Sequence, residues 1–199
     1  MSSVHLLAGL ARRLNREAGA PTLPSLYFFT DPARTYDPVR VAKRLPRGTA
    51  VVYRHFGASE RTRIARRLAH VCRARGLVLL MAGDPELAAR VGADGVHWPE
   101  QRLPTQRDAR PWLVTVAAHS APAVSRAEAF GADACFLAPV LPTRSSSGRR
   151  PLGLFRSSQI ARAARLPTIA LGGINARTAR LLTGRGFAGV AAVDALSFA

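Results

Sequence analysis

The sequence lacks any long apolar run. Its longest apolar stretches, such as residues 77–82 and 188–193, have the length of a strand. None approaches the roughly 18 residues that a membrane span requires. Near the N-terminus, mildly apolar residues come before Arg12, Arg13 and Arg16, the reverse of the order in a secretory signal. We therefore expect a cytoplasmic protein that does not work at a membrane.

Cysteine is also scarce. Cys72 and Cys135 lie in apolar stretches without the CxxC or CxxH spacing of a metal site. Isolated cysteines in apolar surroundings are typical of buried thiols. We predict two reduced, buried thiols rather than a disulfide, and no resident cofactor.

Acidic residues and lysine are few. Only 12 acidic residues face 29 basic ones, which gives a net charge of +17, and Lys43 is the single lysine. Such a surplus attracts polyanions and small phosphorylated molecules. The arginines occur in every segment, and no zinc-finger, KH-type or RNP-like pattern accompanies them. We expect a small phosphorylated substrate rather than a nucleic-acid partner; nucleic-acid binding, which a steep salt dependence of affinity would reveal, stays open as an alternative, and so does self-association.

Short apolar segments that alternate with helical ones dominate the rest of the chain. Consecutive apolar residues, rather than alternating ones, are typical of parallel strands covered on both faces. Eight strand–helix units predict an α/β fold, a (β/α)₈ barrel, with an open doubly wound sheet as the alternative. The predicted strands are Leu26–Thr30, Ala50–Arg54, Leu77–Met81, Gly95–His97, Leu113–Ala118, Ala134–Ala138, Thr168–Leu171 and Gly189–Val193.

An additional helix is predicted before the first strand. Val4, Leu7, Leu10 and Leu14 recur at helical spacing, which favours an amphipathic helix packed on the body. The whole chain, 1–199, then forms a single barrel domain. Residues 1–24 supply the N-terminal helix and a linker, and residues 25–199 supply the barrel.

Two loops at the predicted strand ends favour phosphate binding. Gly172 and Gly173 follow the seventh strand and precede a predicted helix, 175–183, capped by Asn175, so backbone N–H groups can face an oxyanion. The loop 143–147 adds hydroxyls and Arg144, and arginine binds oxyanions through charge-assisted hydrogen bonds. Barrel phosphate sites commonly use the last loops of the fold.

Five motifs make the sequence resemble one known family in order and spacing. They are Gly92–His97 (GADGVH), Ala118–Ser120 (AHS), Pro139–Thr143 (PVLPT), Ala170–Asn175 (ALGGIN) and Gly189–Ala191 (GVA), with an opening strand LYFFTD at Leu26–Asp31. Together they resemble the thiamine phosphate synthase / thiazole tautomerase (TenI) family, over residues 26–196. The resemblance implies a (β/α)₈ barrel enzyme of thiamine biosynthesis. The synthase branch joins a pyrimidine diphosphate to a thiazole phosphate, and the tautomerase branch isomerises a thiazole carboxylate phosphate.

The resemblance implies that the thiazole-phosphate half of the family's site is largely kept. Its phosphate loop corresponds to Thr143, Arg144 and Ser145, its amide contact to Gly173, and the pair after the eighth strand to Val193 and Asp194. Asp194 departs from the family's serine. A carboxylate repels phosphate, so we expect Asp194 to cap a short terminal helix instead.

The pyrimidine-diphosphate half is less well kept. Arg54 survives from the family's pattern after the second strand, and Arg102 replaces a magnesium carboxylate after the fourth. An ungapped alignment places Ala82 and Gly83 at the family's Asn–Asp pair, with Asp84 one residue late. No metal site is therefore expected, unless the alignment is shifted by one residue in the loop after the third strand. Such a shift would make Asp84 a Mg²⁺ ligand.

These matches predict a divergent family member with tautomerase-like chemistry. His119 matches the tautomerase's histidine and is the candidate proton carrier. Thr143, Arg144, Ser145, Gly173 and Val193 would hold the substrate phosphate, and Arg54 and Arg102 a second phosphate or diphosphate. Two alternatives stay open: a full, Mg²⁺-dependent thiamine phosphate synthase, and a non-catalytic barrel that binds a ligand.

Overall fold

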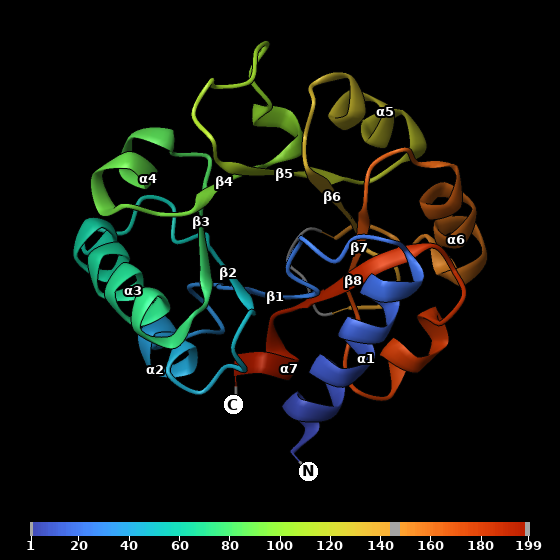
Figure 1. Cartoon of the computed structure of the whole chain (residues 1–199), viewed down its shortest axis with the longest axis horizontal. Helices are drawn as coiled ribbons and strands as arrows, with labels where there is room; N and C mark the ends of the chain where they lie inside the picture. Colours follow the sequence, from blue (N-terminus) through green and yellow to red (C-terminus); the bar gives the residue numbers. More distant parts are fainter. Residues whose placement is uncertain (1, 144–147, 198–199) are drawn as a thin grey trace.

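Eight parallel strands pair in chain order and close into a barrel (Figure 1). This computed structural model describes residues 2–143 and 148–197. The observed closure confirms the predicted (β/α)₈ barrel and rules out the open sheet. The strands are β1 (Leu26–Phe29), β2 (Ala50–Tyr53), β3 (Val78–Ala82), β4 (Gly95–Trp98), β5 (Leu113–Ala118), β6 (Ala134–Leu137), β7 (Thr168–Leu171) and β8 (Phe187–Ala192).

Helices surround this barrel, and local sequence signals set several of their ends. The side chains of Asp84 and Ser120 accept hydrogen bonds from backbone N–H groups in the first turns of their helices, as N-caps do. Gly76 and Gly92 end two helices in the left-handed conformation that glycine adopts without strain. The α-helices are α1 (Ser3–Glu17), α2 (Pro38–Ala42), α3 (Arg61–Arg75), α4 (Pro85–Val91), α5 (Ala121–Ala129), α6 (Gly153–Ala163) and α7 (Asp194–Ser197).

Two strands are followed by short 3₁₀ turns instead of full α-helices. These are η1 (Glu100–Arg102) after β4 and η2 (Thr178–Leu182) after β7. The prediction of a regular helix over 175–183 was therefore wrong. The Asn175 side chain accepts from the backbone N–H groups of Arg177 and Thr178, and the Thr178 hydroxyl donates to the Gly173 carbonyl; such local bonds compete with regular helical bonding.

The N-terminal helix α1 covers the outside of β8. It packs against β8, η2 and α7, next to the strand that is followed by only the four-residue helix α7 (Figure 1). Val4, Leu7 and Leu14 are buried as predicted, whereas Leu10 is partly buried. Asn15 anchors the end of α1 because its Nδ2 donates to the β8 carbonyl of Ala188 over 3.1 Å. The helix thus takes the place of the missing eighth outer helix.

Aromatic rings fill the inside of the barrel. Phe136 of β6 contacts Tyr27 and Phe29 of β1 edge to face, with ring centroids 4.8 Å apart in both pairs. His97 packs beside them at 5.2 Å from Phe136. A side-chain-filled interior closes the barrel axis, so ligands can enter only from the ends.

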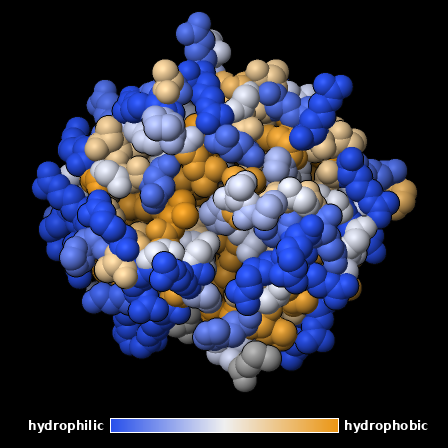
Figure 2. Space-filling model, viewed as in Figure 1, coloured by the Kyte–Doolittle hydropathy of each residue, from blue (hydrophilic) through white to orange (hydrophobic). Residues whose placement is uncertain are grey.

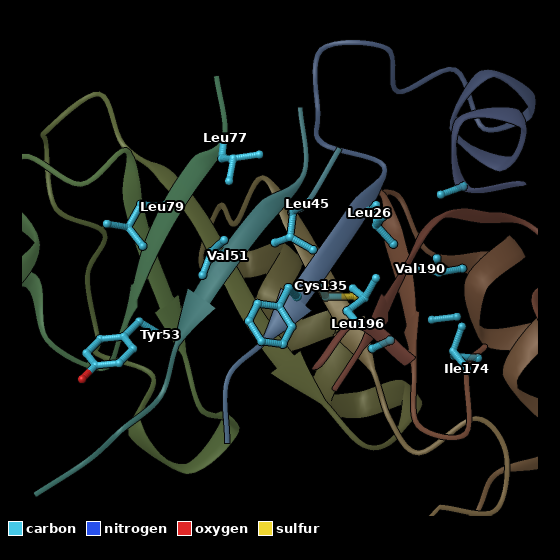
Figure 3. Packing of buried hydrophobic residues seen from close by; sticks show 14 of the residues in the cluster. Leu26, Leu45, Val51, Tyr53, Leu77, Leu79, Cys135, Ile174, Val190 and Leu196 are labelled. Carbon is cyan, nitrogen blue, oxygen red and sulfur yellow. The ribbon is translucent and has the colours of Figure 1, made fainter. Parts of the chain in front are cut away.

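A second apolar layer lies between the strands and the surrounding helices. Figure 3 shows part of it, with Val51, Leu79 and Val190 on the strands packing outward. Cys72 and Cys135 are both buried and free, which confirms the prediction of buried thiols. Burial raises the pKa of the Cys135 thiol to about 11, so it stays protonated and unreactive near neutral pH.

The role of α1 can be tested with a pair of leucine truncations. Leu14 is 2% exposed and Leu10 only partly buried, so Leu14→Ala is expected to lower the free energy of unfolding by about 2–5 kcal/mol. Leu10→Ala, the matched control on the same helix, should cost clearly less. Urea unfolding followed by circular dichroism measures both. Equal, small losses would show that α1 does not contribute to the core.

Candidate functional site

The carboxyl ends of the strands surround a cavity of about 820 Å³. Strand termini and the loops that follow all contribute to its wall, as parallel strands in a closed barrel require. We call this cavity the mouth. Its lining includes Phe29, Arg54, His97, His119, Thr143, Gly173 and Val193. Figure 2 shows the face on the side of the linker that precedes β1, where apolar side chains lie between hydrophilic ones.

Most of the predicted site residues meet at the mouth. His119, Thr143, Gly173, Val193 and Arg54 all line it, although they come from five different loops. Arg144 and Ser145 lie outside the described residues. Arg102 is not in the lining; its guanidinium lies 5.7 Å from the ring of Phe56, which does line the mouth.

The loops after β6 and β7 pack so closely that only glycine fits between them. A Cβ on Gly173 would lie 2.5 Å from the carbonyl oxygen of Pro142, and one on Gly172 would lie 2.7 Å from Cβ of Pro139. The turn is held through the Gly173 carbonyl, which accepts from the Thr178 hydroxyl over 2.8 Å. This rim therefore presents backbone and small side chains at the mouth, the surface an oxyanion prefers.

A network of two arginines and two aspartates lies on the adjoining part of the rim, after β8, β1 and β2. Arg34 donates to Asp31 over 2.8 Å and to Asp194 over 3.3 Å. Arg54 lies 3.6 Å from the same Asp31 carboxylate. Partial burial raises the pKa of Asp31, but the hydrogen bond and charge of Arg34 and the charge of Arg54 outweigh burial, and the pKa is lowered.

Asp194 is the first residue of α7, and its carboxylate is paired with an arginine. Its carboxylate accepts two hydrogen bonds from one Arg34 nitrogen, at 3.3 and 3.4 Å. The sequence provided no sign of this partner, because Arg34 is 160 positions away. Arg34 thereby offsets the negative charge of this carboxylate at the mouth.

Arg54 is held in place from several sides. Its Nε donates to the Thr30 carbonyl over 2.9 Å, and its guanidinium lies 5.2 Å from the Phe29 ring. Its side chain is 30% exposed. A cation fixed in this way has little rotamer entropy to lose when it binds an anion.

His119 belongs to a chain of three polar side chains. Its Nδ1 lies 2.6 Å from Oε2 of Glu100, and Oε1 of Glu100 accepts from Arg126 over 2.7 Å. Because a carboxylate only accepts, Nδ1 carries the hydrogen, and Nε2 of the neutral ring keeps its lone pair. A histidine oriented by a carboxylate in this way is the arrangement of a general base.

The other two histidines of the strand ends are buried. His97 is 3% exposed, and its Nδ1 lies 3.1 Å from the Thr115 hydroxyl. Burial lowers the pKa of His97 to about 3. His55 stacks beside Tyr53, and burial lowers its pKa too. Both rings stay neutral near pH 7, which favours a structural part for His97.

The residues at the mouth do not fit a divalent cation. Mg²⁺ is usually held by one or two carboxylates together with substrate phosphates. Asp84 does not line the mouth: one oxygen caps α4 and the other lies 3.5 Å from Arg61. Asp31, Glu100 and Asp194 are each paired with a cation. In residues 2–143 and 148–197, no cluster of three or more His, Cys, Asp or Glu could ligate a metal.

Sequence reasoning missed two functional groups of the mouth. Glu100 follows β4 directly and was visible among the strand-end residues, but nothing in the sequence links it to His119 across 19 positions. Arg34 lies in an irregular loop without a motif. Only the closure of the barrel brings β1 beside β8, and so Arg34 beside Asp194.

Fold and site together define a (β/α)₈ barrel with a small-molecule site at the carboxyl ends of its strands. The family model for thiamine monophosphate synthase matches residues 26–196. The chain belongs to this family.

Individual relatives agree with this assignment. The thiamine-phosphate synthase of Bacillus velezensis is 32% identical over 93% of this chain and 88% of its own length. That of Chlorobium luteolum is 32% identical over 89% of this chain and 87% of its own length. A thiamine phosphate pyrophosphorylase structure from Pyrococcus furiosus superposes with a TM-score of 0.74 at 25% identity, covering 96% of this chain and 90% of that one. Among the described residues, no helix is long and apolar enough to cross a membrane.

The neutral, buried state of His97 predicts how stability depends on pH. Its pKa is about 3 in the folded protein and about 6.5 when unfolded, so between these values the unfolded chain binds more protons. Stability is therefore lost as the pH falls below about 6.5, by up to ~1.4 kcal/mol per pH unit from this group.

Urea unfolding at pH 7.0 and 4.5 tests this dependence. The loss of stability on acidification should be about 2 kcal/mol smaller in His97→Gln than in the wild type. His70→Gln, at an exposed position on α3, is the control and should behave as the wild type. Identical pH dependence in all three proteins would mean that His97 is not held neutral.

Proposed function

We propose that the mouth binds a thiazole phosphate or a similar small phosphorylated molecule, and that His119 moves a proton on it. The observation that carries this proposal is the His119–Glu100–Arg126 chain. A hydrogen bond from His119 Nδ1 to Glu100, over 2.6 Å, orients the imidazole. Nε2 is then left as the free base at a cavity large enough for a ligand.

The reaction that fits is an isomerisation. Nε2 takes a proton from one position of the ligand, and the imidazolium returns it to another position, so no atom is lost and no electron changes hands. Glu100 stabilises the imidazolium as it forms, because its carboxylate lies beside Nδ1. Arg126 in turn keeps Glu100 in place over 2.7 Å.

The ligand's phosphate would lie on the rim of the loops after β6 and β7. Thr143 and the Gly173 backbone face the mouth there, and Val193 adds an apolar wall. Arg144 and Ser145 belong to the same loop in the sequence and complete this proposed subsite. Arg34, which already neutralises Asp194, keeps the neighbouring rim free of negative charge.

The proton carrier is tested by substitution at His119. In His119→Gln, kcat for isomerisation of the thiazole carboxylate phosphate should fall by about 10²–10⁴-fold with little change in KM, because the base is lost and the anion subsite stays. Glu100→Gln should lower kcat to a smaller extent, again with KM nearly unchanged.

His70→Gln, a histidine outside the mouth, is the matched control for this experiment. It should retain wild-type kcat and KM. An unchanged kcat in His119→Gln would remove His119 from the role of base, and a rise in KM alone would make it a binding residue.

A second candidate is the coupling reaction named for the relatives, thiamine-phosphate synthesis. It is favoured by the 32% identity to two such synthases and by Arg54, a fixed cation at the mouth that suits a diphosphate. In this case Arg54, with Arg102 nearby, would hold the diphosphate. The carboxylates near the mouth are paired with arginines, so no step is assigned to Mg²⁺.

A coupling assay separates the two candidates. Purified protein is given both family substrates, the pyrimidine diphosphate and the thiazole phosphate, with and without Mg²⁺, and pyrophosphate release is measured. Our first proposal predicts no release above background under either condition while the isomerase assay is positive. Release that depends on Mg²⁺ and falls at least tenfold in Arg54→Gln would favour the synthase.

A further inference from the structure

The positive charge of this chain is concentrated in one stretch. Residues 38–75 hold eleven of the 29 basic residues but only one of the 12 acidic ones, Glu60. These residues form α2, β2 and α3, and α2 packs against α3 on the outside of the barrel. Figure 1 shows the two helices side by side on one flank of the molecule. The packing of α2 against α3 therefore brings basic residues of this stretch onto one flank of the molecule.

Helix α3 has one basic and one apolar face. Its apolar face is buried against the barrel through Ala65, Leu68, Ala69, Val71 and Cys72. The opposite face exposes Arg63, Arg66, Arg67, His70 and Arg73. Their spacings of three and four residues put like charges side by side, which costs an isolated helix about 0.2–0.5 kcal/mol per pair. The helix keeps a repulsive row of charge from Arg63 to Arg73, about 15 Å of its length.

The neighbouring α2 and the loop after it extend this row. Arg40, Lys43 and Arg47 are exposed there. The Arg47 side chain lies against Gly76, which ends α3: a Cβ on Gly76 would lie 3.0 Å from Arg47 Nε. Arg47 also lines a second cavity, of about 290 Å³, together with Arg12 and Arg16 of α1. Charge thus continues from α3 to the end of the barrel opposite the mouth.

Acidic side chains do not neutralise this surface. Asp37 caps α2, and Glu60 pairs with Arg63 at the start of α3. Across residues 2–143 and 148–197, no salt bridge involves Arg66, Arg67 or Arg73. Closely spaced guanidinium groups without acidic partners repel one another. This repulsion falls when they bind an anion that carries many charges at regular spacing.

We propose that this surface binds the sugar-phosphate backbone of a nucleic-acid duplex. The basic face is defined by Arg40, Lys43, Arg47, Arg63, Arg66, Arg67, Arg73 and Arg75. A duplex carries one negative charge per about 1.7 Å of its axis, so a row of about 15 Å spans several phosphates. Arginine binds phosphate oxygens bidentately. The interaction is independent of sequence and separate from the mouth.

The composition of the basic face argues against two other partners. Protein interfaces have aromatic and apolar centres depleted in charge, and helices that lie on membranes insert large apolar side chains. The large hydrophobic side chains exposed among the described residues are Tyr36, Phe56, Phe155 and Leu181. None of them lies on α2 or α3, so this face offers neither a protein hot spot nor a membrane anchor.

The test measures binding to a fluorescent 20-base-pair RNA duplex and to a DNA duplex of the same sequence, from 50 to 200 mM salt. The variant is Arg66→Gln/Arg67→Gln/Arg73→Gln. The matched control is Arg156→Gln/Arg177→Gln/Arg180→Gln, which replaces three exposed arginines on α6 and around η2. Both triple variants lower the net charge by the same amount. Circular dichroism and the isomerase or coupling assay verify that all proteins are folded and active at the mouth.

We expect both duplexes to bind the wild type with affinity that falls steeply with salt. The α3 variant should bind at least tenfold more weakly at 50 mM salt, with a salt slope smaller by about 3. The control should remain within about threefold of the wild type. If one duplex binds more tightly than the other, that preference shows whether the partner is an RNA or a DNA duplex.

Three results would overturn the proposal. One is the absence of duplex binding at 50 mM salt. Another is an equal loss of affinity in the control variant, which would assign binding to net charge rather than to this face. The third is binding to vesicles rich in anionic lipid that the α3 variant loses, with no binding to either duplex.

Discussion

The pairing of β1 with β8 is the interaction on which the rest of this structure depends. It joins Leu26, Tyr27 and Phe28 to Val190, Ala191 and Ala192 in parallel register. The close fit shows at Gly189, where a Cβ would lie 2.4 Å from the Ser25 carbonyl oxygen. Without this closure the strands would form an open sheet, and the loops after β1 and β8 would not meet.

Closure has a direct electrostatic consequence at the mouth. It brings Arg34 from the loop after β1 to Asp194 after β8, at 3.3 Å. The carboxylates of that rim are thereby neutralised by guanidinium groups and unavailable as a free acidic cluster. The mouth consequently combines fixed cations, a small-residue rim and one histidine oriented by a carboxylate. These features suit a phosphorylated ligand and proton transfer better than the holding of a divalent ion.

Much of this architecture could be predicted from the sequence. The strands were found within a few residues of their ends because consecutive apolar residues are buried on both sides, and α1 was found from the spacing of Val4, Leu7 and Leu14. The family motifs correctly placed His119, Thr143, Gly173, Val193 and Arg54 around one cavity. Each of these signals is local in the sequence or comes from a motif.

What could not be predicted depends on contacts between distant segments. The Glu100–His119 and Arg34–Asp194 pairs need the barrel to be closed before their partners meet. The cover of β8 by α1 likewise depends on a contact between the two ends of the chain. The basic face was missed because the count of arginines in 38–75 does not show which of them share one exposed surface; that is set when α2 packs against α3.

The central claim is that the mouth holds a phosphorylated ligand through its own backbone, hydroxyls and guanidinium groups. Calorimetric titration of the protein with a thiazole phosphate, once in EDTA and once in excess Mg²⁺, tests it most directly. We predict saturable binding with one ligand per chain and the same Kd in both buffers. Binding that appears only with Mg²⁺ would contradict this account.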